Sequence, residues 1–366
     1  MMNRYYYIDD EVDTIKSIAD GINDINVVKV DIFPLSVNKD FDTLTDTLRR
    51  EWDSFDGLIL DLKLDGGGVD STKFTATSLA QWISSYVISE AKSAKPLVLL
   101  SNDLQCANFR EDITSHDLFD MVWERSGRLD WSMLANILNI LAEDYKKLNE
   151  DHSKNLKILL QSDTIDTGAT YFAPFLDSAK FNVRQFASFI LNDLFVHPGL
   201  LISENLLAAR YGVDIEKSGA AWKIFKDKYL GVALYRGLFG SITEVYWSRK
   251  SYEVFLQLSG GRSATSMTTT QRVKALKENI TEAHGLIAYE PVDEKISTYC
   301  WAIDEVTGQP LDSSEGYMIQ EDGGLKLWQE PRFLSFDTIE SGNKGDYTLV
   351  PSEQIRFEDD LASLDD

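Results

Sequence analysis

Two short apolar runs that end in carboxylates decide the fold: Tyr5-Tyr6-Tyr7-Ile8-Asp9-Asp10, near the start of the chain, and Gly57-Leu58-Ile59-Leu60-Asp61, further along. Apolar runs of this length are typical of strands that are buried on both faces of a sheet. In an open parallel sheet, functional sites lie beyond the carboxyl ends of the strands. The two runs therefore predict that Asp9, Asp10 and Asp61 lie together at one sheet edge. Because these carboxylates repel one another, we expect a hard cation such as Mg²⁺ between them.

The composition indicates a folded and acidic protein. Its 366 residues are enough for two domains, and hydrophobic residues make up 43% of the chain, which is ample for a core. The formal net charge is −23, whereas proteins that bind nucleic acids or anionic membranes usually carry a basic patch. This charge disfavours nucleic-acid and membrane binding, and it suits basic protein partners.

The sequence predicts a cytoplasmic protein. Its two cysteines, Cys106 and Cys300, lie far apart and form no CxxC pair, which is typical of a reduced compartment. The start of the chain shows no signal-peptide pattern, and no apolar run has the length needed to span a bilayer. The four histidines are also far apart, which argues against a histidine-rich zinc site.

Strand-like and helix-like segments alternate over residues 1–128, which form the first predicted domain. Such alternation is typical of βαβ units, and it predicts an α/β fold with a doubly wound parallel sheet. The predicted strands cover residues 4–8, 26–30, 57–60, 96–101 and 118–123, and the predicted helices cover residues 11–22, 40–53 and 78–92.

The residues at the predicted strand ends resemble those of a response-regulator receiver domain, whose fold is flavodoxin-like. Asp9 and Asp10 match the family's acidic pair after the first strand. Asp61 matches the phospho-accepting aspartate after the third strand, and Ser101 matches the hydroxyl residue that ends the fourth. The resemblance covers about the first third of the chain.

This resemblance implies a phosphoryl-transfer site. Asp61 would accept a phosphoryl group from a histidine kinase, and Ser101 would donate a hydrogen bond to that group. Mg²⁺ would be bound by Asp10, Asp61 and the backbone carbonyl of Lys63, while Asp9 would hold its waters.

The sequence also departs from the receiver pattern. Glu124 falls where the family has a lysine after the fifth strand, and Arg125 follows one residue later. A planar guanidinium is not equivalent to the point charge of a lysine. Three interpretations therefore stay open: a working phospho-acceptor, a pseudo-receiver that binds partners, and a set of aspartates that only cap helices and turns.

The rest of the chain resembles no family in the same way. Residues 129–155 are predicted to form a connecting helix, of a kind that also dimerises receiver proteins, so a homodimer is one expectation. Residues 156–366 are predicted to be a mainly helical domain with a strand-and-loop region and a frayed acidic tail after Phe357. Within this domain, residues 203–213 have a serine cap and a glycine stop and resemble the first helix of a helix-turn-helix.

We therefore expect a signalling or regulatory protein in which a receiver-like domain controls a C-terminal protein-interaction module. Non-standard receivers of this kind also occur in bacterial multi-gene systems, including anti-phage defence operons. Beyond self-phosphorylation from a phosphodonor, no enzyme motif is visible.

An enzyme with its active site in the C-terminal domain is the first alternative, and a deep polar pocket within residues 200–335 would favour it. A DNA-binding regulator is the second, and a basic helix face within residues 203–226 would favour it.

Overall fold

The computed structural model divides the chain into two compact units. The N-terminal unit comprises Met1–Asp193 and Gly237–Ile242, and the C-terminal unit comprises Leu194–Arg236 and Thr243–Asp366. The division falls later along the chain than the predicted boundaries at residues 128 and 155. The structure describes residues 2–9, 12–35, 40–62, 64, 74–101, 118–125, 130–151, 156–163, 165, 169–176, 181–291 and 295–363.

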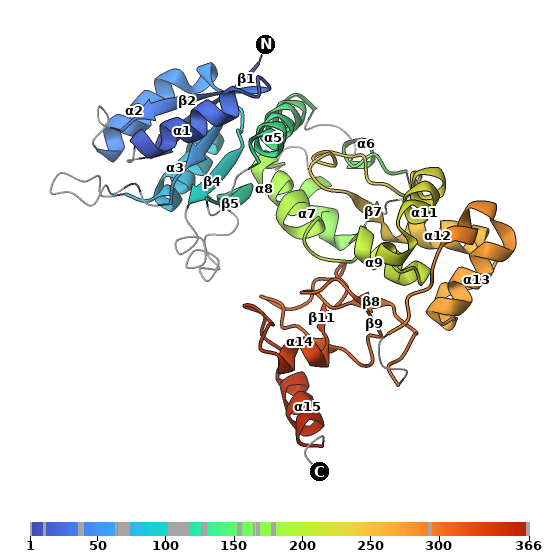
Figure 1. Cartoon of the computed structure of the whole chain (residues 1–366). Helices are drawn as coiled ribbons and strands as arrows, with labels where there is room; N and C mark the ends of the chain where they lie inside the picture. Colours follow the sequence, from blue (N-terminus) through green and yellow to red (C-terminus); the bar gives the residue numbers. More distant parts are fainter. Residues whose placement is uncertain are drawn as a thin grey trace. The chain divides into compact units, whose positions relative to one another are not determined.

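The N-terminal unit is built on a five-stranded sheet in the order β2-β1-β3-β4-β5, in which all neighbouring strands are parallel (Figure 1). This is the strand order of flavodoxin-like folds, so the predicted doubly wound sheet is confirmed. All five predicted strands are present. Their bounds are Asn3–Asp9 (β1), Val28–Pro34 (β2), Gly57–Leu60 (β3), Leu97–Ser101 (β4) and Met121–Glu124 (β5).

Helices cover both faces of this sheet. Side chains of β1, β3 and β4, among them Ile8, Leu60 and Leu99, form one apolar core with α2 and α3. On the other face, the Tyr5 hydroxyl donates to the carbonyl of Leu138 in α5 at 2.6 Å, and α5 also contacts α1. The helix predicted as a connector is therefore part of the unit. The bounds are Val12–Asn23 (α1), Phe41–Glu51 (α2), Ala76–Ser89 (α3) and Trp131–Asp151 (α5).

Glycine at position 57 lets an aromatic ring lie across the sheet. Tyr5 pairs with Gly57 in the register of β1 and β3, and a Cβ on Gly57 would lie 2.2 Å from the Tyr5 ring. The ring therefore takes the space of the missing side chain, and its hydroxyl reaches α5.

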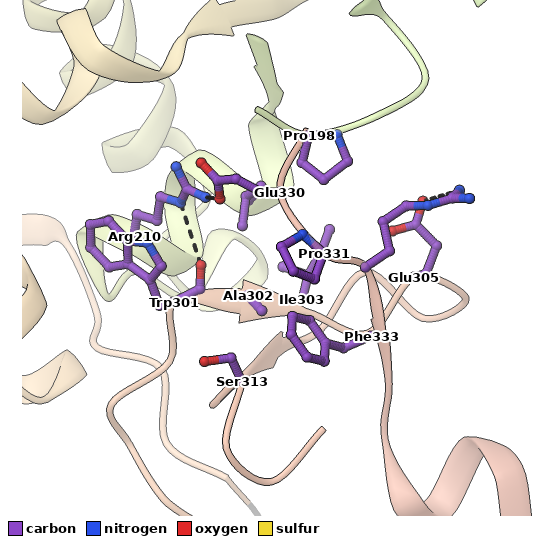
Figure 2. Close-up of a pocket in the computed structure, with 12 residues that line it drawn as sticks. Pro198, Arg210, Trp301, Ala302, Ile303, Glu305, Ser313, Glu330, Pro331 and Phe333 are labelled. Carbon is purple, nitrogen blue, oxygen red and sulfur yellow. Dashed lines mark hydrogen bonds and ion pairs between the residues drawn. The ribbon is translucent and has the colours of Figure 1, made fainter. Parts of the chain in front are cut away.

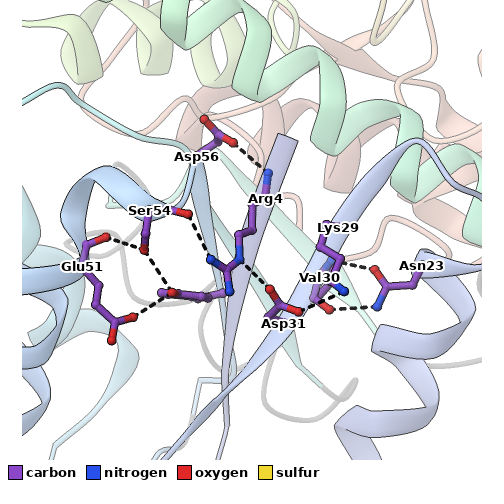
Figure 3. A network of polar contacts seen from close by, with 9 residues as sticks. Arg4, Asn23, Lys29, Val30, Asp31, Glu51, Ser54 and Asp56 are labelled. Atoms are coloured by element: carbon purple, nitrogen blue, oxygen red, sulfur yellow. Dashed lines mark hydrogen bonds and ion pairs between the residues drawn. The ribbon is translucent and has the colours of Figure 1, made fainter. Parts of the chain in front are cut away.

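Polar contacts fix the amino ends of β1 and β2 (Figure 3). The Arg4 guanidinium bonds the Asp31 carboxylate at 2.5 Å, and the Arg4 backbone N–H donates to the Asp56 carboxylate at 2.8 Å. The Asn23 side chain, at the end of α1, exchanges two hydrogen bonds with the backbone of Val30. The charged side chains at this edge are thus engaged in holding the sheet together.

The segment after α5 returns to the sheet, which is why the unit extends to residue 193. Arg184 donates to the backbone carbonyls of Lys95 at 2.9 Å and of Leu118 at 2.8 Å. Its guanidinium also lies 3.7 Å from the buried carboxylate of Asp120, to which the Tyr145 hydroxyl donates. The elements of this segment are α6 (Leu156–Leu159), η3 (Thr170–Phe172), α7 (Ala173–Leu176), α8 (Val183–Ser188) and η4 (Phe189–Leu194).

The C-terminal unit combines short helices with three two-stranded antiparallel sheets, as the prediction of a mainly helical α+β domain requires. Its helices are α9 (Glu204–Tyr211), α10 (Ile215–Ser218), α11 (Ala220–Phe225), η5 (Lys226–Leu230), α12 (Ser248–Leu258), η6 (Ala264–Ser266), α13 (Thr269–Asn279), η7 (Thr281–Gly285), α14 (Phe336–Glu340) and α15 (Pro351–Ala362). Its strands are β6 (Leu201–Ser203), β7 (Val245–Trp247), β8 (Ala302–Ile303), β9 (Pro310–Leu311), β10 (Tyr317–Met318) and β11 (Phe333–Leu334). None of the described helices of the chain is long and apolar enough to cross a membrane.

A fully buried arginine organises the centre of this unit. Arg272 donates to the carbonyls of Ala264 at 2.8 Å, Ala209 at 3.1 Å and Cys300 at 2.5 Å. These carbonyls come from three separate segments, so one side chain ties three parts of the unit together through their backbones.

The prediction of a frayed acidic tail is wrong for the part that the structure describes. Residues 351–362 form α15, in which Phe357 is buried against the ring of Tyr317. The Tyr317 hydroxyl donates to the Asp360 carboxylate at 2.6 Å. Apolar and aromatic contacts therefore hold a segment whose charge alone suggested disorder.

The predicted serine cap and glycine stop of α9 are both present. The Ser203 hydroxyl accepts the N–H of Leu206, and Gly212 ends the helix with a φ of +75°. We predict that Gly212→Ala destabilises the C-terminal unit by about 2 kcal/mol or more, because φ is left-handed and a Cβ would lie 2.6 Å from the Thr269 carbonyl.

Gly261→Ala is the matched control. Gly261 also has a left-handed φ, +86°, but a Cβ there meets nothing within 4 Å. We expect it to cost about 1 kcal/mol, from backbone strain alone. Thermal and urea unfolding of the full chain compares the two variants, and equal losses would show that the contact with Thr269 does not constrain α9.

Candidate functional site

Two predicted site residues meet at the carboxyl edge of the sheet. Ile8 pairs with Leu60, so Asp9 and Asp61 follow at the same level of neighbouring strands. The N–H of Asp61 donates to the carbonyl of Ile8 at 3.1 Å, which extends the ladder by one residue. Both aspartates are almost fully buried, with 1% and 4% of their surface exposed. The other two predicted metal ligands, Asp10 and Lys63, lie outside the described residues.

One arginine among the described residues bonds both carboxylates. Nη2 of Arg125 donates to Oδ2 of Asp9 at 3.0 Å and also forms an ion pair with Oδ1 of Asp61. Nε of the same guanidinium donates to the carbonyl of Leu100 at 3.2 Å. The Arg125 side chain is 14% exposed, so this is a largely buried three-charge cluster.

Arg125 is positioned by the end of β5. Ser101 pairs with Glu124, the last residue of β5, and the next residue, Arg125, donates its backbone N–H to the Ser101 carbonyl at 2.6 Å. The cation beside Asp61 is therefore Arg125, one residue beyond the position at which the receiver pattern led us to expect a lysine. Burial lowers the pKa of Arg125, but the neighbouring Tyr7, Asp61 and Asp9 raise it more, so its pKa lies above the ordinary value and the charge is secure.

Ser101 and Tyr7 complete the surroundings. Ser101 ends β4, as predicted, and is fully buried. Tyr7 lies two residues before Asp9, on the same face of β1, and its buried hydroxyl has no hydrogen-bond partner in the described part of the chain. Burial, opposed by Arg125, raises the pKa of Tyr7. The alternation of Tyr5, Tyr7 and Asp9 along one face of the strand is the sequence signal by which Tyr7 could have been predicted to lie near this site.

The described residues supply only part of a Mg²⁺ site. Asp9 and Asp61 offer hard oxygen ligands, but the Arg125 guanidinium bonds an oxygen of each. Among the residues that the structure describes, no group of three His, Cys, Asp or Glu side chains could hold a metal ion. Within the described residues, the Arg125 guanidinium offsets one of the two negative charges of this cluster.

The C-terminal unit contains two small adjoining cavities, of about 190 and 90 Å³. The walls of the larger cavity come from α9, β8 and the segments around Pro198 and Pro331 (Figure 2). Residues 194–198, β6, α9 and β8 line the smaller one. Apolar side chains line most of the surface, and the charged groups in the larger cavity form ion pairs with one another or with neighbours.

Comparisons with known proteins find similarity at the level of solved structures only: no protein-family model and no curated protein matches the chain. One similar structure is a response regulator receiver domain protein from Clostridium thermocellum, with 14% identity, 41% of this chain and 98% of that chain covered, and a TM-score of 0.28. Another is the signal receiver domain of a putative LuxO repressor protein from Vibrio parahaemolyticus, with 11% identity, coverage of 42% and 99%, and a TM-score of 0.29.

A third is RcsB from Salmonella enterica serovar Typhimurium, bound to the promoter rprA in the presence of the phosphomimetic BeF3⁻, with 14% identity, coverage of 51% and 87%, and a TM-score of 0.26. The N-terminal unit has the flavodoxin-like fold of receiver domains. The 2-1-3-4-5 order of its parallel strands identifies this fold.

We predict that Arg125→Ala lowers the opening free energy of β1 and β3 by about 3 kcal/mol, because it removes a largely buried cation that bonds two buried carboxylates. Adding Asp61→Asn should recover part of this loss, since one of the two charges is then gone. Hydrogen-exchange mass spectrometry of the full chain reports on these strands separately.

Arg49→Ala is the control, because Arg49 is exposed in the same unit, where it forms an ion pair with Asp46 and lies over the ring of Trp82. Exposed pairs contribute at most about 1 kcal/mol. If Arg125→Ala and Arg49→Ala had the same effect, the cluster would not be a buried, mutually dependent set of charges.

Proposed function

We propose that this protein is a signalling regulator in which Asp61 accepts a phosphoryl group and the C-terminal unit binds a protein partner in response. The observation that carries the proposal is the guanidinium of Arg125 on the buried carboxylates of Asp9 and Asp61, at the carboxyl edge of a flavodoxin-like sheet. Sites of parallel α/β folds lie at this edge, beside the strand-order reversal between β1 and β3.

The residues have distinct roles in the proposed transfer. A carboxylate oxygen of Asp61 attacks the phosphorus of the donor, the bond from phosphorus to the donor atom breaks, and the donor keeps the electron pair and takes up a proton. Phosphoryl transfer depends mainly on positioning and on neutralising charge. Arg125 supplies that charge, and the Ser101 hydroxyl would donate to a phosphoryl oxygen.

The same contacts suggest how a signal would leave the site. A phosphoryl group on Asp61 brings new negative oxygens to the guanidinium, so Arg125 would exchange its bond to Asp61 for bonds to the phosphoryl group. The backbone of Arg125 is tied to Ser101, and the two residues would therefore move together. The end of β5, with Arg125, is the element that this exchange would bias.

The proposal includes the cellular setting predicted from the sequence. The donor would be a histidine kinase, the compartment would be the cytoplasm, and the partner contact could involve a homodimer or other proteins of a defence system. Mg²⁺, with Asp10 and the Lys63 carbonyl among its ligands, would add positive charge opposite the phosphoryl oxygens.

The described geometry gives less support to an enzyme in the C-terminal unit. The larger cavity, about 190 Å³, is smaller than the 300 Å³ or more that is usual for ligand sites. The Cys300 thiol is buried, which raises its pKa to about 11 despite nearby Arg272, so it is a poor nucleophile.

A DNA-binding regulator is also less well supported. Residues 203–226 do not form a free basic face, since Lys226 bonds Glu204 and Glu244, and Lys217 lies 3.0 Å from Asp214. Arg210 is buried and paired with Glu330.

Intact-mass analysis after incubation with acetyl phosphate tests the proposal. We expect one added phosphoryl group on the wild type, none on Asp61→Asn, and slower labelling of Arg125→Ala by about 100-fold, since a charge stabilising the transition state is lost. Arg125→Lys should keep part of the rate because it keeps the charge. Reactions with and without MgCl₂ test the predicted role of the metal.

Absence of an adduct in folded wild type, with acetyl phosphate and with a panel of phosphorylated histidine kinases, would overturn the acceptor role and leave the pseudo-receiver interpretation. An adduct that persists in Asp61→Asn would contradict the assignment of the acceptor.

A further inference from the structure

The larger cavity of the C-terminal unit has the dimensions and lining of a pocket for one side chain (Figure 2). Its volume is about 190 Å³, and Leu206, Ile303 and Phe333 are among its apolar wall residues. Pockets of this size, apolar at the base with charges at the rim, receive the anchoring side chains of protein partners. The volume is too small for most cofactors or drug-sized ligands.

Two arginines form fixed parts of the wall. Arg210 donates to the Ser248 hydroxyl at 2.9 Å, and its guanidinium lies 4.9 Å from the centre of the Trp301 ring. Arg332 makes two hydrogen bonds to Glu321, at 2.7 and 2.9 Å. Both arginines thus have partners besides the glutamates of the cavity.

In the ion pairs around the cavity, the carboxylate side chains are more exposed to solvent than the arginine side chains. The Glu330 side chain is 39% exposed against 7% for Arg210, and Glu305 is 21% exposed against 11% for Arg332. The region that supplies most of the lining, residues 301–350, contains ten acidic and three basic residues. An incoming ligand therefore meets negative charge first, which favours a cationic one.

The smaller cavity extends the binding surface. It has a volume of about 90 Å³ and shares four lining residues with the larger one. Glu305 is among them, so a carboxylate lies where the two cavities adjoin. Two adjoining side-chain pockets with a shared carboxylate suit an extended peptide in which one residue is apolar and its neighbour is basic.

We infer that these cavities bind a basic peptide segment of a protein partner, in which an apolar side chain enters the larger cavity and a neighbouring arginine or lysine pairs with Glu305 or Glu330. This inference deepens the proposed function by giving the chemical class of the partner of the C-terminal unit.

Fluorescence anisotropy of the full chain with labelled hexapeptides tests the inference. The probes are Gly-Gly-Leu-Arg-Gly-Gly, its Phe and Trp analogues at the Leu position, and matched peptides with Glu or Ala in place of Arg. We expect the Arg peptides to bind with a dissociation constant below about 1 mM, and to bind about tenfold more tightly than the Ala peptides. The Glu peptides should bind most weakly.

Two variants and one control locate the binding site. Glu305→Gln removes a rim charge while Arg332 keeps Glu321, and we expect it to weaken the Arg peptides about fivefold without affecting the Ala peptides. Ala302→Leu fills the larger cavity from β8 and should weaken all apolar probes. Glu340→Gln removes an equal charge at an exposed position in α14 and should change little.

Binding of no Arg peptide at about 1 mM by folded protein would overturn the inference, as would equal binding of the Arg and Glu peptides. Equal effects of Glu305→Gln and Glu340→Gln would show general charge attraction and would overturn it too. The acetyl phosphate reaction at Asp61 does not use these cavities. If the peptides do not bind, the proposed phosphoryl acceptance still stands. If Asp61 is not phosphorylated, peptide binding by the cavities still stands.

Discussion

The ion pairs from Arg125 to Asp9 and Asp61 are the constraint on which the N-terminal unit depends. The register of β1 and β3 brings two carboxylates to the same level of neighbouring strands, where both are buried. Two negative charges that are buried on neighbouring strands would disfavour the sheet unless a positive charge lay beside them. Arg125 provides it from the end of β5, so the cluster ties together the first, third and fifth strands of the sheet.

This arrangement also explains how a receiver-like fold can retain its acidic edge without the usual lysine. An arginine one residue beyond β5 is anchored through its backbone to Ser101 and through Nε to the Leu100 carbonyl. The guanidinium then reaches both aspartates with one nitrogen. Because its donors have a fixed planar arrangement, Arg125 is held in one orientation where a lysine would be free to move. The cluster is thus charged and ordered in the structure as it stands.

Most of the fold could be predicted from the sequence, because each buried strand is a short apolar run and each intervening helix has apolar residues at helical spacing. The identity of the cation beside Asp61 could not be predicted from the sequence. The segment Met121–Glu124 has no clear periodicity, so the end of β5 was uncertain by one residue, and one residue decides whether a glutamate or an arginine faces Asp61. The helical tail was missed because its charge suggested solvation, whereas Phe357 packs against Tyr317, a contact that only the folded chain brings about.

The C-terminal unit is held together by a different means. Its strands are two or three residues long, so many backbone carbonyls have no partner in a sheet. Buried arginines bond two of them: Arg272 donates to the carbonyl of Cys300, and Arg210 donates to the carbonyl of Trp301. Arg210 is thereby held in the interior, while its partner Glu330 is 39% exposed at the larger cavity. Sequence spacing gives no sign of it, since the contacts join residues far apart in the chain.

The most direct test of the account is a ¹⁹F NMR titration of the full chain with beryllofluoride, a mimic of the phosphoryl group, in the presence of MgCl₂. If Arg125 provides a usable cation beside Asp61, the wild type shows bound fluorine resonances, Asp61→Asn shows none, and Arg125→Ala shows them only at higher beryllofluoride concentration. The absence of bound resonances from folded wild type would contradict the claim that this edge of the sheet is built to hold a phosphoryl group.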